Sequence, residues 1–141
     1  MGPVSEASGS PGGSKSQVVL DASAVLALLY GEPGQGEIRE RIRGAEIRIG
    51  AVNVSEVSAK LAEAGFSRAE CREAVDALAP AVHPLDEDLA HAAGQMRPTT
   101  KDRGLSLGDR ACLALASSLG VAALTTDSGW DGLDYAEVIQ R

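Results

Sequence analysis

The sequence predicts an α/β protein, a three-layer α/β/α sandwich around a mainly parallel central sheet. Two observations carry this prediction. Short apolar runs alternate with helix-forming segments along the chain, and two of those runs end in an aspartate. The chain has 141 residues, of which 44% are hydrophobic and only 3% aromatic. We therefore expect one domain with an aliphatic core.

The predicted domain spans residues 17–141, because residues 1–16 are dominated by Gly, Ser and Pro and carry almost nothing apolar. Such a segment cannot bury a core, so we interpret it as a disordered leader. No apolar run approaches the roughly 18 residues that a membrane span needs. The N-terminus also lacks the apolar centre of a signal peptide. Cys71 and Cys112 lie in apolar helical segments and are expected to be buried free thiols, which fits a cytoplasmic protein.

The first half of the chain alternates strand and helix. Residues 17–21 form a short apolar run typical of a buried strand, and residues 22–31 continue with helix formers and a terminal Gly. A Pro-Gly break then precedes a second amphipathic helix. Residues 46–51 alternate polar and apolar side chains, as in a strand. Residues 53–65 place apolar side chains at helical spacing and end at Gly65.

The second half repeats this alternation. Ser67 and Glu70 form a capping box that begins one helix, and Ser106 and Gly120 are placed to begin and end another. Three acidic residues open the segment between them, which favours a helix N-terminus. The predicted elements are, in order, helix 66–78, strand 81–85, helix 86–101, helix 105–120, strand 121–127 and strand 135–140.

Four carboxylates are the candidate catalytic and metal-binding residues. Asp21 and Asp127 each end an apolar run, and ligands of open parallel sheets bind beyond the carboxyl ends of the strands. Glu56 and Asp109 are predicted to lie in the first turn of a helix that starts at the same edge. Each acid also has an ordinary structural role available to it. Asp21 could cap the following helix, Glu56 and Asp109 could form capping boxes with Asn53 and Ser106, and Asp127 could hold a turn.

The four acids taken together favour a metal site over four separate caps. Carboxylates gathered at one edge repel one another and have raised pKa values unless a cation neutralises them. Mg²⁺, with Mn²⁺ as a substitute, prefers such oxygen ligands. Carboxylate-bound Mg²⁺ can lower the pKa of a bound water and stabilise charge on a phosphate, so no side-chain nucleophile is needed.

The charge balance argues against one class of function. The formal net charge is −7, which does not suit a module held to DNA by a broad basic surface. Lys101, Arg103 and Arg110 lie near Asp109 in the sequence and are candidates for contacting RNA phosphates. A solvated basic patch is the alternative for all three. Trp130 is a candidate for stacking on a base or for anchoring its loop to the core.

Four segments carry a resemblance to a known family: LDASAVLALLYGEPG, VNVSEVSAKL, LSLGDRACLALA and LTTD, in this order. From Val18 to about Ile139 the chain resembles the PIN-domain nucleases, and within them the VapC-type toxins of type II toxin–antitoxin pairs. The resemblance implies a Mg²⁺-dependent endoribonuclease that dimerises and is held inactive by a cognate antitoxin protein. It assigns Asp21, Glu56, Asp109 and Asp127 to the acidic quartet. Ser23 and Thr125 correspond to accessory hydroxyls near the metal.

Two other functions compete with this interpretation. A magnesium phosphatase of the haloacid dehalogenase type also places an Asp after its first strand, but it needs a second Asp where this chain has Ser23. A PIN-like scaffold that binds RNA or protein without cutting is the alternative outside the enzymes. The complete set of four acids argues against it.

Overall fold

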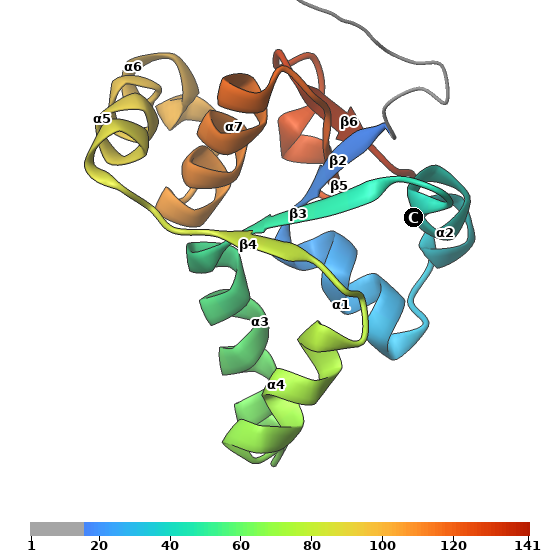
Figure 1. Ribbon diagram of the computed structural model, residues 1–141. Helices are drawn as coiled ribbons and strands as arrows, with labels where there is room; N and C mark the ends of the chain where they lie inside the picture. The colour runs from blue at the N-terminus through green and yellow to red at the C-terminus, as the bar shows by residue number, and fades with distance from the viewer. Residues whose placement is uncertain (1–15) are drawn as a thin grey trace, which may run out of the picture.

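The computed structural model describes residues 16–141, and its centre is a five-stranded sheet (Figure 1). The strands are arranged in the order β4-β3-β2-β5-β6, and every neighbouring pair is parallel. The predicted parallel sheet is therefore confirmed. All but the last residue of the predicted leader, 1–16, lies outside the described residues. The strands are β2 (Gln17–Leu20), β3 (Glu46–Gly50), β4 (Ala81–His83), β5 (Ala123–Thr125) and β6 (Ala136–Val138).

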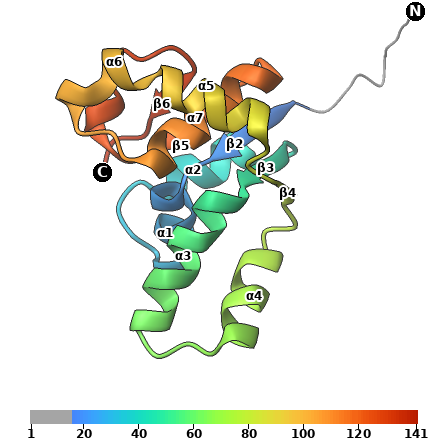
Figure 2. The ribbon, with the colours of Figure 1, turned by 90° about the vertical axis from the view of Figure 1, so that its left-hand side faces the viewer.

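Helices connect the strands and cover both faces of the sheet (Figures 1 and 2). The helices are α1 (Ala22–Tyr30), α2 (Gln35–Ile42), α3 (Ala51–Glu63), α4 (Arg68–Asp76), α5 (Glu87–Gln95), α6 (Arg97–Thr100), α7 (Leu107–Leu119) and the 3₁₀ turns η1 (Lys101–Arg103) and η2 (Ser128–Trp130). None of the helices between residues 16 and 141 is long and apolar enough to cross a membrane.

Two cores flank the sheet because successive side chains of a strand point to opposite faces. In β2, Val18 and Leu20 pack into the core formed with α1, α2, α3 and α4, whereas Val19 packs into the core formed with α7 and Trp130. Figure 2 shows α3 and α4 as a pair that extends away from the sheet, opposite α5 and α6. This arrangement confirms the predicted sandwich.

The structure corrects two predicted helices. Residues 86–101 do not form one helix, because α5 ends at Gln95 and α6 begins at Arg97. Pro98 explains the break, since proline has no N–H and its ring clashes with the carbonyl four residues earlier. The helix predicted over residues 53–65 begins at Ala51 instead, with Gly50 as its N-cap. Asn53 and Glu56 therefore do not form a capping box, and Glu56 lies in the second turn of α3.

Candidate active site

The first predicted acid, Asp21, lies at the carboxyl end of the central strand β2 and is only 4% exposed. It is the N-cap of α1, and its Oδ1 accepts a hydrogen bond from the Ala24 backbone N–H at 2.8 Å. The Ser23 hydroxyl donates to the same oxygen at 2.7 Å. The Thr125 hydroxyl, which comes from β5, donates to Oδ2 at 2.6 Å. Asp21 is therefore both a helix cap and the centre of a buried polar network.

Burial raises the pKa of Asp21 to about 6. The hydrogen bonds from Thr125, Ala24 and Ser23 oppose this rise because they stabilise the charged form, whereas the negative charge of Asp109 adds to it. When no cation is near, a carboxyl group held in this way binds a proton as the pH falls through about 6. A divalent cation would replace that proton and reverse the effect of burial.

The two predicted accessory hydroxyls join the ends of β2 and β5. Ser23 Oγ accepts the Thr126 backbone N–H at 2.9 Å, and Thr125 Oγ1 accepts the Asp127 N–H at 3.0 Å. The two hydroxyl oxygens lie 3.2 Å apart. Each hydroxyl has a single hydrogen, and both hydrogens point to Asp21, so Asp21 receives the full donor capacity of the pair.

Glu56 and Asp109 approach the same region from α3 and α7. Asp109 forms the predicted capping box with Ser106: its Oδ2 accepts the Ser106 N–H at 2.9 Å, and its own N–H donates to Ser106 Oγ at 3.2 Å. Burial raises the pKa of the Cys112 thiol well above its ordinary value, and the negative charges of Asp21, Asp109 and Glu56 raise it further. Three of the four predicted acids therefore lie near enough to one buried thiol to influence its protonation.

Asp127 stands apart from the other three acids. Its side chain is exposed, and Oδ1 accepts the Gly129 N–H at 2.8 Å, so it acts as the predicted turn residue. Its connection to Asp21 runs through its backbone N–H and the Thr125 hydroxyl. It borders an open hollow that Ser23 and Thr126 also line. Trp130, three residues later, is fully buried and anchors this loop, as one of the two interpretations of this residue predicts.

The donor set fits a water-rich magnesium site. In residues 16–141, no three His, Cys, Asp or Glu side chains lie close enough together to hold an ion by themselves. Mg²⁺ does not need them, because it keeps several water ligands and uses one or two carboxylates in many protein sites. Asp21, Glu56 and Asp109 supply carboxylate oxygens of the right chemistry. Burial, with a smaller contribution from the negative charge of Asp109, raises the pKa of Asp21 when no cation is present.

The three predicted phosphate-binding residues are placed differently from one another. Arg110 Nη1 donates to the Ala93 carbonyl of α5 at 3.1 Å, and its half-buried side chain packs between helices. Arg103 donates to the Gly129 and Asp131 carbonyls at 3.3 and 2.6 Å, so it holds the loop after Asp127. Lys101 is exposed in η1.

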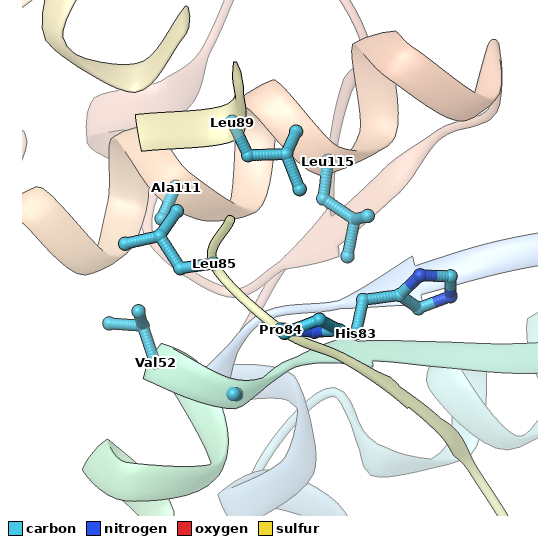
Figure 3. Close-up of a pocket in the computed structure, with 9 residues that line it drawn as sticks. Val52, His83, Pro84, Leu85, Leu89, Ala111 and Leu115 are labelled. Carbon is cyan, nitrogen blue, oxygen red and sulfur yellow. The ribbon is translucent and has the colours of Figure 1, made fainter. Parts of the chain in front are cut away.

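A small pocket near the ends of β3 and β4 is not part of this site. Leu85, Leu89 and Leu115 point into it beside His83 (Figure 3). Its walls are mostly apolar, it has room for about one water molecule, and none of the predicted acids lines it. Nothing in its chemistry matches a phosphate or a metal ion.

Two residues beside Glu56, namely Asn53 and Gly108, were missed from the sequence. Asn53 Nδ2 donates to Glu56 Oε1 at 2.9 Å and to the Gly108 carbonyl at 3.2 Å. A signal was present in the sequence, since Asn53, Val57 and Leu61 succeed one another at intervals of four and are all buried. A polar residue on an apolar helix face needs a partner, and Asn53 finds it on α7.

Comparison with known protein families matches residues 18–134 to the PIN domain. A search of curated proteins finds no match. Among solved structures, the chain is similar to a toxin–antitoxin complex from Klebsiella pneumoniae, with 17% identity and a TM-score of 0.71 over 86% of this chain and 97% of that one. It is also similar to VapC20 of Mycobacterium tuberculosis, described as a sarcin-ricin loop cleaving toxin, with 19% identity and a TM-score of 0.70 over 88% of this chain and 100% of that one.

A third similar structure is VapBC-5, a toxin–antitoxin system of Mycobacterium tuberculosis, with 22% identity and a TM-score of 0.60. The match covers 89% of this chain and 99% of the VapBC-5 chain. These identities are low, and the likeness to the three structures therefore shows a common fold. The family match rests on the sequence itself and spans all four predicted acids, from Asp21 to Asp127.

Proposed function

The chain belongs to the PIN-domain family, and from this premise we propose that it is a Mg²⁺-dependent endoribonuclease acting as the toxin of a type II toxin–antitoxin pair. The observation that carries the proposal is Asp21, a buried carboxylate with a pKa raised to about 6, with Asp109 close enough to raise it further. Burying a charge is costly unless it is paired. A divalent cation held at this point would supply the missing pair.

The residues of the candidate site have different roles in the proposed reaction. Asp21, Glu56 and Asp109 would supply the carboxylate ligands of Mg²⁺, or of Mn²⁺ in its place, with water molecules completing the coordination. Asp127 would face the substrate side of the same site. The bound ion would lower the pKa of a water and stabilise charge on the phosphate. Ser23 and Thr125 keep the Asp21 carboxylate in one orientation. Cys112 is excluded as a nucleophile, because a buried thiol with a raised pKa stays protonated.

The partners in the proposal are inferred from the similar structures and from charge. Two of the three similar structures are named as toxin–antitoxin systems, and the third is named as a sarcin-ricin loop cleaving toxin. We infer RNA as substrate, a cognate antitoxin as inhibitor and a homodimer as the assembly, in the cytoplasm. With a net charge of −7, the chain suits an antitoxin segment that presents a basic side chain to the acidic site. Arg103 and Lys101 remain the candidates for phosphate contact.

The haloacid dehalogenase alternative loses support from the contacts of Ser23. That phosphatase class needs a carboxylate at this position, whereas the Ser23 hydroxyl here donates to Asp21 and accepts the Thr126 N–H. The cleavage test described next distinguishes the nuclease from the scaffold that binds without cutting.

The test is cleavage of total RNA with and without Mg²⁺, with the cut ends mapped. We expect Mg²⁺-dependent cleavage that Asp109→Asn and Glu56→Gln abolish. Glu63→Gln changes an exposed acid on the same helix as Glu56 and should cleave like the wild type. Retained cleavage in the first two variants would contradict the metal site, and no cleavage by the wild type would favour the scaffold.

Expression in cells tests the toxin part of the proposal separately. We expect growth arrest that a co-expressed small protein encoded beside the toxin relieves. Cleavage in vitro without growth arrest would instead indicate a housekeeping nuclease.

A further inference from the structure

Asn53 is a buried polar side chain that the proposed reaction does not yet use. It is 1% exposed, and its Nδ2 donates hydrogen bonds to Glu56 Oε1 and to the Gly108 carbonyl. Its Oδ1 has no partner within the described part of the chain. A buried amide that directs both donors at one carboxylate and one neighbouring carbonyl fixes the position of that carboxylate.

Gly108 shapes the other side of the same carboxylate. A Cβ at Gly108 would lie less than 3.0 Å from Glu56 Oε1, Cδ and Oε2, a separation that real Cβ atoms do not show. The Glu56 carboxylate therefore occupies the space that a side chain at position 108 would fill. Glycine within a helix costs about 1 kcal/mol relative to alanine. Its presence in the first turn of α7 has a steric reason here.

We propose that Asn53 and Gly108 are positioning residues that fix the Glu56 carboxylate against the first turn of α7, which carries Asp109, for metal binding. This inference rests on the proposed function. Glu56 is on α3 and Asp109 is on α7, so the two acids meet only if the helices are held in register. Asn53 links them by bonding to both Glu56 and the residue before Asp109. Outer-shell contacts of this kind orient ligands, and their loss typically weakens metal binding by about 10–100-fold.

The two residues act on a side chain that is otherwise free to move. Glu56 has three rotatable side-chain bonds and is only half-buried, so nothing else in the described contacts restrains its carboxylate. Holding such a side chain in one rotamer costs conformational entropy, which the Asn53 hydrogen bond and the space at Gly108 offset before an ion arrives. A preorganised carboxylate binds an ion more tightly than a mobile one.

The decisive variant is Gly108→Ala, because the added Cβ pushes away the end of a flexible side chain and not the backbone. We expect Mn²⁺ binding, measured by titration calorimetry on the protein without RNA, to weaken by about tenfold or more. The melting temperature should fall little. Gly94→Ala is the matched control, since it lies in helix α5 with nothing within 4 Å of the added Cβ. It should bind Mn²⁺ like the wild type.

Asn53→Ala gives a second measurement, and excess Mg²⁺ should restore part of its RNA cleavage rate. A merely structural residue would lower the melting temperature without changing the Mg²⁺ concentration at half-maximal rate. If Asn53→Ala does not fold, Gly108→Ala still decides. If Gly108→Ala binds Mn²⁺ as tightly as the wild type while Glu56→Gln binds it more weakly, the positioning role is wrong and the metal site stands. Unchanged binding in Glu56→Gln would overturn the proposed metal site, and the positioning role with it.

Discussion

Asp21 and Asp127 occupy equivalent positions in the sequence pattern and very different positions in the structure. Both come after neighbouring parallel strands, and each accepts a backbone N–H at 2.8 Å at the start of a helical turn. Asp21 is buried and also receives two hydroxyl groups, whereas Asp127 is exposed and receives only that N–H through its side chain. Both aspartates therefore cap a helical turn. Only Asp21 is also buried and bonded by hydroxyl groups, and these contacts distinguish it as a candidate metal ligand.

The difference arises from the segment of chain after each strand. Helix α1 begins at Ala22, so Asp21 is held directly at the end of β2 between β3 and β5. After β5 the chain continues through two residues before η2, and Trp130 then anchors the loop in the core. Asp127 is therefore displaced toward solvent, and its backbone N–H rather than its carboxylate remains tied to the buried network.

The largest expected effect separates the two aspartates in catalysis. Asp21→Asn should lower the rate of RNA cleavage by about a thousandfold, beyond the 10–100-fold that outer-shell groups typically contribute. Asn keeps the shape and the N-cap, so the fold should remain. Asp127→Asn should cost about tenfold, in the range of an outer-shell group. Initial rates at saturating Mg²⁺ measure both. Equal losses in the two variants would show that exposure does not distinguish their roles.

The second effect concerns stability against pH in the absence of metal. The pKa of Asp21 is about 6 in the folded protein and near 3.8 without the fold. Between these values the folded state binds more protons than the unfolded state, so the free energy of unfolding falls as pH rises. The shift corresponds to a loss of about 3 kcal/mol from below pH 4 to above pH 6. Other groups add their own slopes, so the wild type must be compared with Asp21→Asn.

Urea denaturation with a chelator present, from pH 4 to 7, makes this comparison. The side chain in Asp21→Asn cannot ionise. The free energy of unfolding of this variant, relative to that of the wild type, should therefore increase as the pH rises from 4 to 7. Saturating Mg²⁺ should reduce the difference by stabilising the charged carboxylate. A parallel curve for Asp21→Asn would contradict the raised pKa.

The strands, the parallel sheet and the end of β2 could be predicted because they depend on local patterns. Apolar runs ending in an acid fix a strand and its carboxyl edge, and Ser67–Glu70 and Ser106–Asp109 form the capping boxes that their spacing indicates. The resemblance to PIN-domain nucleases was confirmed by the family match. The assignment of the four acids to a metal stays a prediction.

The remaining features depend on contacts between distant elements. The spacing of Asn53, Val57 and Leu61 marks Asn53 as a polar residue on an apolar helix face. It does not identify the Gly108 carbonyl as its second partner, because that group lies 55 residues further along the chain. The same holds for Arg110, whose contact with the Ala93 carbonyl requires knowing that α5 packs on α7. The hydrogen bond from the Thr125 hydroxyl to Asp21 likewise joins residues that are 104 positions apart, so no local pattern predicts it.

Thr125→Val gives the smallest expected effect and tests whether the two aspartate regions form one unit. The change keeps the side-chain shape but removes the hydroxyl that donates to Asp21 and accepts the Asp127 N–H. Removing this hydroxyl leaves the buried Asp21 carboxylate one donor short, which should cost about 1–3 kcal/mol of stability. Thr100→Val, which removes a buried hydroxyl bonded only to the Met96 carbonyl, is the matched control and should leave cleavage unchanged.

The coupling between Thr125 and the two aspartates then decides the comparison. If Thr125 acts through Asp21, Thr125→Val should slow cleavage by about tenfold in the wild type, as an outer-shell change does, and by much less in the Asp21→Asn background. If it acts through the Asp127 loop, its effect should instead vanish in the Asp127→Asn background. Side chains in one network show such non-additive effects, whereas independent sites add. Additive losses in both double variants would mean that the shared hydroxyl only supports the fold.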